Sequence, residues 1–122
     1  MKDRLPGARV LVVEDNPILA FDIDDALRDS GVEVVGPALD LDSGLALVEQ
    51  DALDGAVLDI DIAGRPVWPI ARRLKGDGVP FVFVSGDCGL GLPEDFSGAV
   101  CLDKPAPTDE ILTTVAQVLK AR

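Results

Sequence analysis

Five short apolar segments alternate with helix-like segments along the chain, and this alternation restricts the fold more than any other feature. The strand-like segments are rich in β-branched or aromatic residues and cover residues 8–14, 32–38, 55–61, 79–85 and 98–103. Three of them are nearly continuous apolar runs, which are typical of strands covered on both faces of a parallel sheet. Five such strands alternating with helices predict an α/β fold with right-handed crossovers.

The segments between these runs carry the signals of amphipathic helices. Asn16 followed by Pro17 is typical of a helix start, and Gly31 is placed to end that helix. Three further helices are expected, starting at residue 42 or 43, covering residues 66–75, and starting at Thr108. Each falls between two predicted strands or after the last one.

Residues 87–97 form the weakest helical segment, because Gly89, Gly91 and Pro93 all disfavour a helix. We therefore expect a short or irregular fourth helix there. The complete pattern predicts a flavodoxin-like (βα)5 fold, a doubly wound parallel sheet with strand order 2-1-3-4-5. With 122 residues the chain is expected to be one domain over residues 1–122, with a core of about 8–121.

The acidic balance of the chain narrows the classes of function. The sequence has 22 acidic and 11 basic residues and a formal net charge of −11. Such a surface repels phosphate backbones, so we expect no direct nucleic-acid partner. No apolar run approaches the roughly 20 residues that span a membrane, and no secretory core follows the N-terminus. A cytoplasmic protein with no membrane partner is therefore expected.

Cys88 and Cys101 are the two cysteines, and the chain contains no histidine. A structural zinc site usually needs four Cys or His ligands, so none is expected. A disulfide is open in principle, but a cytoplasmic setting favours two reduced thiols. We therefore expect two thiols, with Cys101 as a small buried one.

Polar side chains collect where the predicted strands end. They are Glu14 and Asp15 after the first strand, Asp59 and Asp61 at the third, Ser85 at the fourth, and Lys104 after the fifth. In a doubly wound sheet the ligand site lies outside the carboxyl ends of the strands, where the strand order reverses. Carboxylates about 4 Å apart repel by roughly 4 kcal/mol at an effective dielectric near 20, so an offsetting cation is expected. Mg²⁺ suits such an all-oxygen site, and Lys104 adds a mobile charge for a phosphoryl oxygen.

Four ordered segments contain these residues. They are Val-Leu-Val-Val-Glu-Asp-Asn at 10–16, Val-Leu-Asp-Ile-Asp at 57–61 with Gly64 after it, Val-Phe-Val-Ser-Gly at 82–86, and Asp-Lys-Pro at 103–105. In order and spacing they resemble the motifs of the bacterial response-regulator receiver family. The resemblance covers nearly the whole chain.

This resemblance implies a role for Asp59 as phosphoacceptor. Asp59 would attack the phosphorus of a phosphohistidine on a sensor histidine kinase or phosphotransfer protein, and would form an acyl phosphate. Asp15, Asp59 and the main-chain carbonyl of Asp61 would bind Mg²⁺, for which Mn²⁺ could substitute. Glu14 would contribute partly through water. The domain would accept and lose its own phosphoryl group, and would not be a turnover enzyme.

The resemblance also implies which groups would hold the new phosphoryl oxygens. Lys104, Ser85 and the main-chain N–H of Gly86 would do so, and the 104–105 peptide bond is expected to be cis. Two positions depart from the family pattern. Cys101 replaces an aromatic residue whose rotation usually reports phosphorylation, and Asp61 stands where a neutral residue is frequent and could change the lifetime of the acyl phosphate. Residues 83–88 resemble, with substitutions, the Phe-Ala-Thr-Gly-x-Tyr segment of an atypical, often stand-alone subgroup.

Two other functions remain open at this stage. A pseudo-receiver would bind a partner without phosphorylation, but Asp59, Lys104 and the acidic pair are all present. Asp59-Ile60-Asp61 also resembles the Asp-x-Asp motif of haloacid-dehalogenase-like phosphatases. That family normally has a larger chain with this motif on an early strand.

The partners expected from the sequence are proteins. A kinase would contact the first helix through Ile18, Phe21 and Asp22, with Pro105 and Ala106 across the rim of the acidic site. No effector domain is recognisable, so the output would run through an unknown downstream protein, or the chain would be a piece of a longer one. The domain is expected to be a monomer or a phosphorylation-dependent dimer.

Overall fold

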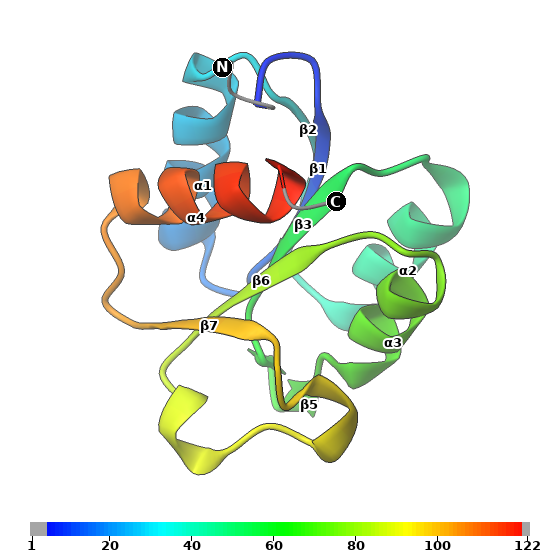
Figure 1. The fold of residues 1–122 in the computed structure, drawn as a ribbon. Helices are drawn as coiled ribbons and strands as arrows, with labels where there is room; N and C mark the ends of the chain where they lie inside the picture. Colours follow the sequence, from blue (N-terminus) through cyan, green and yellow to red (C-terminus); the bar gives the residue numbers. More distant parts are fainter. Residues whose placement is uncertain (1–4, 121–122) are drawn as a thin grey trace.

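A computed structural model describes residues 5–120 and shows a five-stranded parallel sheet (Figure 1). Its strands are β1 (Arg9–Val13), β2 (Glu33–Ala38), β3 (Gly55–Leu58), β6 (Phe81–Ser85) and β7 (Val100–Asp103). They lie in the order β2-β1-β3-β6-β7. This is the predicted order 2-1-3-4-5, so the flavodoxin-like α/β fold is confirmed. The ends of the predicted domain, residues 1–4 and 121–122, lie outside the described part of the chain.

Helices cover both faces of the sheet (Figure 1). The helices α1 (Pro17–Asp29) and α4 (Thr108–Lys120) lie on one face, and α2 (Leu41–Gln50) and α3 (Trp68–Gly76) lie on the other. Each face buries its own apolar cluster, with Phe83 and Ile70 on the α2–α3 side and Ile23 and Val115 on the α1–α4 side. The buried strands therefore read as apolar runs because both of their faces are covered. Within residues 5–120, no helix is long and apolar enough to cross a membrane.

The helix starts follow local capping chemistry. The side chain of Asn16 accepts hydrogen bonds from the main-chain N–H groups of Ile18 and Leu19, at 3.0 and 3.3 Å, so the predicted start of α1 is confirmed. Helix α2 begins at Leu41, just before the expected start, because Asp40 accepts a hydrogen bond of 2.7 Å from the N–H of Ser43.

The segment between β6 and β7 contains two 3₁₀ turns, η1 (Cys88–Leu90) and η2 (Glu94–Phe96), and the expectation of an irregular fourth helix is confirmed. Phe96 attaches this segment to the rest of the molecule. Its side chain is 2% exposed, its ring stacks on Trp68 at a centroid distance of 5.5 Å, and it meets the edge of Phe83 at 5.9 Å.

A disulfide joins Cys88 to Cys101, with the two Cα atoms 5.9 Å apart. The prediction of two reduced thiols is therefore wrong. The two cysteines are brought together by contacts between segments that lie apart along the chain. The parallel pairing of β6 with β7 places Cys101 opposite Phe83, and η1 folds the chain after Ser85 back against β7. Neither arrangement can be inferred from the separation of the two cysteines along the chain.

The third strand ends at Leu58, earlier than the sequence suggested, and a small hairpin follows it. Its strands are β4 (Asp61–Ile62) and β5 (Arg65–Pro66), which pair in antiparallel fashion. The turn passes through Ala63 and Gly64, which have φ angles of 52° and 85°. The tolerance of glycine for such angles explains Gly64, whereas the positive φ of Ala63 is not predicted by its residue type.

Candidate functional site

The main chain brings three site residues to the same edge of the sheet. Hydrogen bonds continue past the strand ends, from the N–H of Glu14 to Ala38 O at 3.0 Å and from the N–H of Asp59 to Val13 O at 2.9 Å. The N–H of Lys104 likewise bonds to Ser85 O at 3.0 Å. The positions of these residues are therefore set by the sheet, which is a rigid element.

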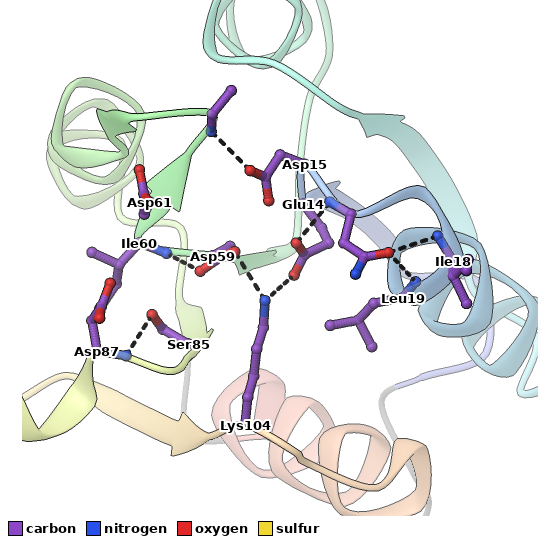
Figure 2. A network of polar contacts seen from close by, with 12 residues as sticks. Glu14, Asp15, Ile18, Leu19, Asp59, Ile60, Asp61, Ser85, Asp87 and Lys104 are labelled. Atoms are coloured by element: carbon purple, nitrogen blue, oxygen red, sulfur yellow. Dashed lines mark hydrogen bonds and ion pairs between the residues drawn. The ribbon is translucent and has the colours of Figure 1, made fainter.

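Three carboxylates form a cluster at this edge (Figure 2). Glu14, Asp15 and Asp59 each place one oxygen so that these atoms all lie within 4.8 Å of one another. Glu14 and Asp59 are only 2% and 6% exposed, whereas Asp15 is half-buried. Buried carboxylates at this spacing repel one another strongly unless a cation offsets their charge.

Lys104 supplies one such cation. Its Nζ lies 2.8 Å from Glu14 Oε1 and 3.0 Å from Asp59 Oδ2, so one ammonium group bridges two buried carboxylates (Figure 2). The sequence placed Lys104 beside the acidic pocket but assigned it to a phosphoryl oxygen. Its contact with Glu14 follows from the burial of Glu14, which was not predicted.

The charges at the site perturb two pKa values. Burial raises the pKa of Glu14 to about 7, and the hydrogen bonds from Lys104 and from the N–H of Asn16 offset only part of this effect. Burial alone would lower the pKa of Lys104, but its hydrogen bonds to Glu14 and Asp59 outweigh burial and raise it. Lys104 is therefore charged at neutral pH, and the burial of Glu14 opposes its ionisation.

Main-chain N–H groups orient the two aspartates. Asp59 Oδ1 accepts a hydrogen bond of 2.7 Å from the N–H of Ile60, and Asp15 Oδ2 accepts one of 2.9 Å from the N–H of Ala63 in the β4–β5 turn. The sequence missed both donors. Any residue except proline carries an N–H, so such donors leave no residue-type signal.

Ser85 lies beside Asp59 at the end of β6 (Figure 2). Its side chain is buried, and its Oγ accepts a hydrogen bond of 3.0 Å from the N–H of Asp87. The hydroxyl proton therefore stays available for donation to another acceptor. Gly86 follows at an exposed position, and the Lys104–Pro105 peptide bond is cis, as predicted.

The side chain of Asp61 forms its hydrogen bond within the hairpin and not with the three clustered carboxylates. Its carboxylate is exposed and accepts a hydrogen bond of 2.9 Å from the N–H of Gly64, within the β4–β5 hairpin. The side chain thus stabilises the turn that carries Ala63, the donor to Asp15. Sequence spacing alone grouped Asp61 with Asp59, because the chain was expected to continue as one strand.

The residues expected to contact a kinase are mostly exposed. On α1, Ile18 and Phe21 are 76% and 49% exposed, and Asp22 is also exposed. Across the rim Pro105 is exposed, whereas Ala106 is half-buried and packs against the α1–α4 core. Large apolar side chains this exposed mark candidate contact surfaces.

Several solved structures share this architecture. A response regulator receiver protein from Sinorhizobium medicae WSM419 is 26% identical, with a TM-score of 0.78, over 96% of this chain and 98% of that one. The receiver domain of a sensor histidine kinase from Pseudomonas aeruginosa PAO1, whose active-site cleft coordinates a magnesium ion, is 22% identical with a TM-score of 0.76. That match covers 93% of this chain and 98% of the other.

Comparisons of the amino-acid sequence alone give no match over most of the chain. No protein-family model matches the chain. A gasdermin, bGSDM from Bradyrhizobium tropiciagri, is 37% identical over 67 residues, which are 55% of this chain and 24% of that protein. The chain therefore spans about a quarter of the length of this curated relative. So short a match carries no argument about activity.

The fold, the strand-end motifs and the structural matches identify the chain as a response-regulator receiver domain of the CheY-like kind. Receiver domains are signalling modules rather than turnover enzymes. The cluster of Glu14, Asp15 and Asp59 resembles the Mg²⁺ site of this class. Its all-oxygen donors and its excess of negative charge over the single ammonium of Lys104 fit a hard divalent cation. Membership of the atypical subgroup stays a prediction.

Proposed function

We propose that this domain accepts a phosphoryl group on Asp59, in a Mg²⁺-dependent reaction, from the phosphohistidine of a sensor histidine kinase or phosphotransfer protein. The observation that carries the proposal is the position of Asp59. Its carboxylate is buried, lies in the three-carboxylate cluster, and contacts Lys104 at 3.0 Å. A buried aspartate with an ammonium group beside it suits both attack on phosphorus and capture of the charge that is transferred.

The hydrogen bond from the N–H of Ile60 to Oδ1 orients the Asp59 carboxylate. Oδ2, which contacts Lys104, is then the oxygen that attacks phosphorus. A bond forms between this oxygen and phosphorus, the phosphorus–nitrogen bond to the donor imidazole breaks, and the imidazole keeps the electron pair.

The other residues hold the group that arrives. Lys104 would exchange its contact with Asp59 for one with a phosphoryl oxygen, and Ser85 would donate its hydroxyl proton to another. The N–H of Gly86 would act as a further donor. These groups neutralise and position the phosphoryl group without themselves being consumed.

Asp15, Asp59 and the main-chain carbonyl of Asp61 would hold Mg²⁺, with Glu14 in part through water; Mn²⁺ could substitute. When bound, the ion supplies positive charge that offsets the phosphoryl oxygens. The N–H of Ala63 keeps Asp15 turned toward the site, so the β4–β5 hairpin acts as a positioning element. Removal of Mg²⁺ with a chelator should therefore abolish phosphorylation.

The signal would leave through protein contacts in the cytoplasm. The donor would approach over Ile18, Phe21 and Asp22 on α1, with Pro105 and Ala106 on the other side. Helix α1 begins just after Glu14 and Asp15, and Pro105 directly follows Lys104. Ile18, Phe21, Asp22 and Pro105 are exposed. A downstream protein or a second copy of the domain would then recognise the phosphorylated form.

Transfer of phosphate to wild-type and Asp59→Asn proteins tests the proposal. With acetyl phosphate or a phosphorylated kinase and Mg²⁺, the wild type should gain the mass of one phosphoryl group, and Asp59→Asn should gain none. Asp25→Asn, on the exposed side of α1, makes the same chemical change away from the cluster and should label normally. Equal labelling of wild type and Asp59→Asn would refute the proposal.

A further inference from the structure

The disulfide between Cys88 and Cys101 lies next to the site and has no place in the proposed phosphotransfer. Cys88 is three residues after Ser85, and Cys101 is three residues before Lys104. The cross-link therefore connects the loop that follows one phosphate-binding side chain to the strand that precedes the other. We propose that Cys88 and Cys101 form a reversible thiol–disulfide site whose redox state controls the loop that orients Ser85.

The loop in question covers residues 86–91, and Leu92 after it packs against the α2–α3 core. The 3₁₀ turn η1 is formed by the hydrogen bonds Leu90 N–H to Asp87 O at 3.0 Å and Gly91 N–H to Cys88 O at 3.3 Å, both of them local. Leu90 is 83% exposed and Gly89 and Gly91 are exposed as well. The disulfide is the covalent attachment of this turn to β7.

The remainder of the segment has an anchor of its own. Phe96 is buried among Trp68, Phe81 and Phe83, and Asp95 pairs with Arg72 of α3 at 2.9 Å. Leu92 packs against the same core. Reduction of the disulfide should therefore release residues 86–91 and leave Leu92 and η2 in place. This difference provides an internal control within one segment.

The loop contacts Ser85 at two points. The N–H of Asp87 donates to Ser85 Oγ at 3.0 Å and so restricts where the hydroxyl proton can point. Cys88 Sγ lies 3.7 Å from Ser85 O. A sulfur held in a disulfide has no proton, so the second contact is a packing contact and not a hydrogen bond. When the turn is released, Asp87 no longer holds the Ser85 hydroxyl in one orientation.

Reduction of the Cys88–Cys101 disulfide requires a partner protein that carries two thiols and acts as the reductant. A thiolate of this partner attacks one sulfur of the Cys88–Cys101 bond, forms a mixed disulfide, and the other sulfur leaves as a thiolate and takes up a proton. The second thiol of the partner then resolves the mixed disulfide. Two electrons pass to the chain, which ends with two thiols, while the partner ends with one disulfide. Both cysteines are half-buried, with exposed Gly89 and Leu90 alongside, so the bond is open to attack at the surface.

The proposed cellular compartment also favours a regulatory role for this disulfide over a purely structural one. In the cytoplasmic setting proposed above, disulfides are usually transient and either catalytic or redox-sensing.

The first test measures the bond and the loop without phosphorylation. Alkylation of the native protein should modify no thiol without reductant and two thiols after treatment with dithiothreitol. After reduction, hydrogen exchange at the amides of Asp87, Leu90 and Gly91 should quicken about fivefold or more, and that at Phe96 and Ala99 less than about twofold. The variant carrying both Cys88→Ser and Cys101→Ser should match the reduced protein and show no response to reductant. Two reactive thiols before reduction, or unchanged exchange in the loop, would overturn the proposal.

The consequence for Ser85 rests on the proposed function and is measured separately. Labelling of Asp59 by acetyl phosphate should occur in both redox states and should be about two- to fivefold slower in the reduced protein, because the hydroxyl is less well oriented. The double serine variant should show the slow rate with or without reductant. Absence of labelling in both states would count against the proposed function and leave the thiol and exchange results standing. An equal rate in both states, with the loop released, would overturn the coupling to Ser85.

Discussion

Replacing Lys104 with methionine removes the ammonium group that bridges Glu14 and Asp59 and keeps most of the side chain's volume. In the unmodified protein the two contacts are 2.8 and 3.0 Å long, and the side chains of Glu14 and Asp59, taken alone, are 2% and 7% exposed. Breaking a buried ion pair on one side costs about 3–5 kcal/mol, because the remaining charge is left unpaired. A quarter of the Lys104 side chain is exposed, so we take the lower end, about 3 kcal/mol, at neutral pH without Mg²⁺.

The loss should depend on pH in a defined direction. The pKa of Glu14 in the folded protein is already raised to about 7 from its ordinary value of 4.5. A raised carboxyl pKa contributes stability that is fully present below the unfolded value and is lost as the pH rises through the folded value. Without Lys104 this pKa rises further, because a group that lowers it is removed. The variant's deficit should therefore be largest near pH 8 and fall to about half near pH 5, where Glu14 is protonated in both proteins.

Urea unfolding, followed through the fluorescence of the single tryptophan, Trp68, measures this loss. With a slope of about 1.5 kcal/mol per molar urea, the midpoint at neutral pH should fall by about 2 M. Added Mg²⁺ should stabilise the variant more than the wild type, because the ion replaces the missing positive charge. Lys120→Met, at the exposed end of α4, should change stability by less than about 0.5 kcal/mol. A deficit of equal size at both pH values would refute the electrostatic reasoning.

Two further predictions concern the framework of the site. Phe96→Ala should destabilise the domain by about 3–5 kcal/mol in urea unfolding, because it empties the aromatic cluster around a side chain that is 2% exposed. Leu90→Ala, in the same segment but 83% exposed, should be nearly neutral, and similar losses for both would contradict the anchoring role of Phe96. Asn16→Ala should cost about 1 kcal/mol through loss of the α1 cap, and Asn16→Asp should restore most of it. If the aspartate variant is as unstable as the alanine variant, capping is not what Asn16 contributes.

The parallel sheet and the location of the site could be predicted from local patterns. Continuous apolar runs at 55–58 and 81–85 require cover on both faces, and such strands with intervening helices allow few topologies. Once the strand order is set, Glu14, Asp59 and Lys104 must meet, because the carboxyl ends of parallel strands share one edge. The glycines and proline of residues 87–97 likewise predicted an irregular segment, since their effect on a helix is local.

The environment of each side chain depended on tertiary contacts. The burial of Glu14, its raised pKa and its pairing with Lys104 arise from segments distant along the chain. The same holds for the β4–β5 hairpin, whose Ala63 N–H reaches Asp15 across 48 positions, and for the disulfide, which the sequence had assigned as two thiols. The sequence by itself determined which elements form and which residues gather at the edge of the sheet, because periodicity and capping act over a few residues. Only the tertiary structure decided which atoms are buried, bridged or cross-linked there, because those outcomes depend on distances between chain segments that no local pattern encodes.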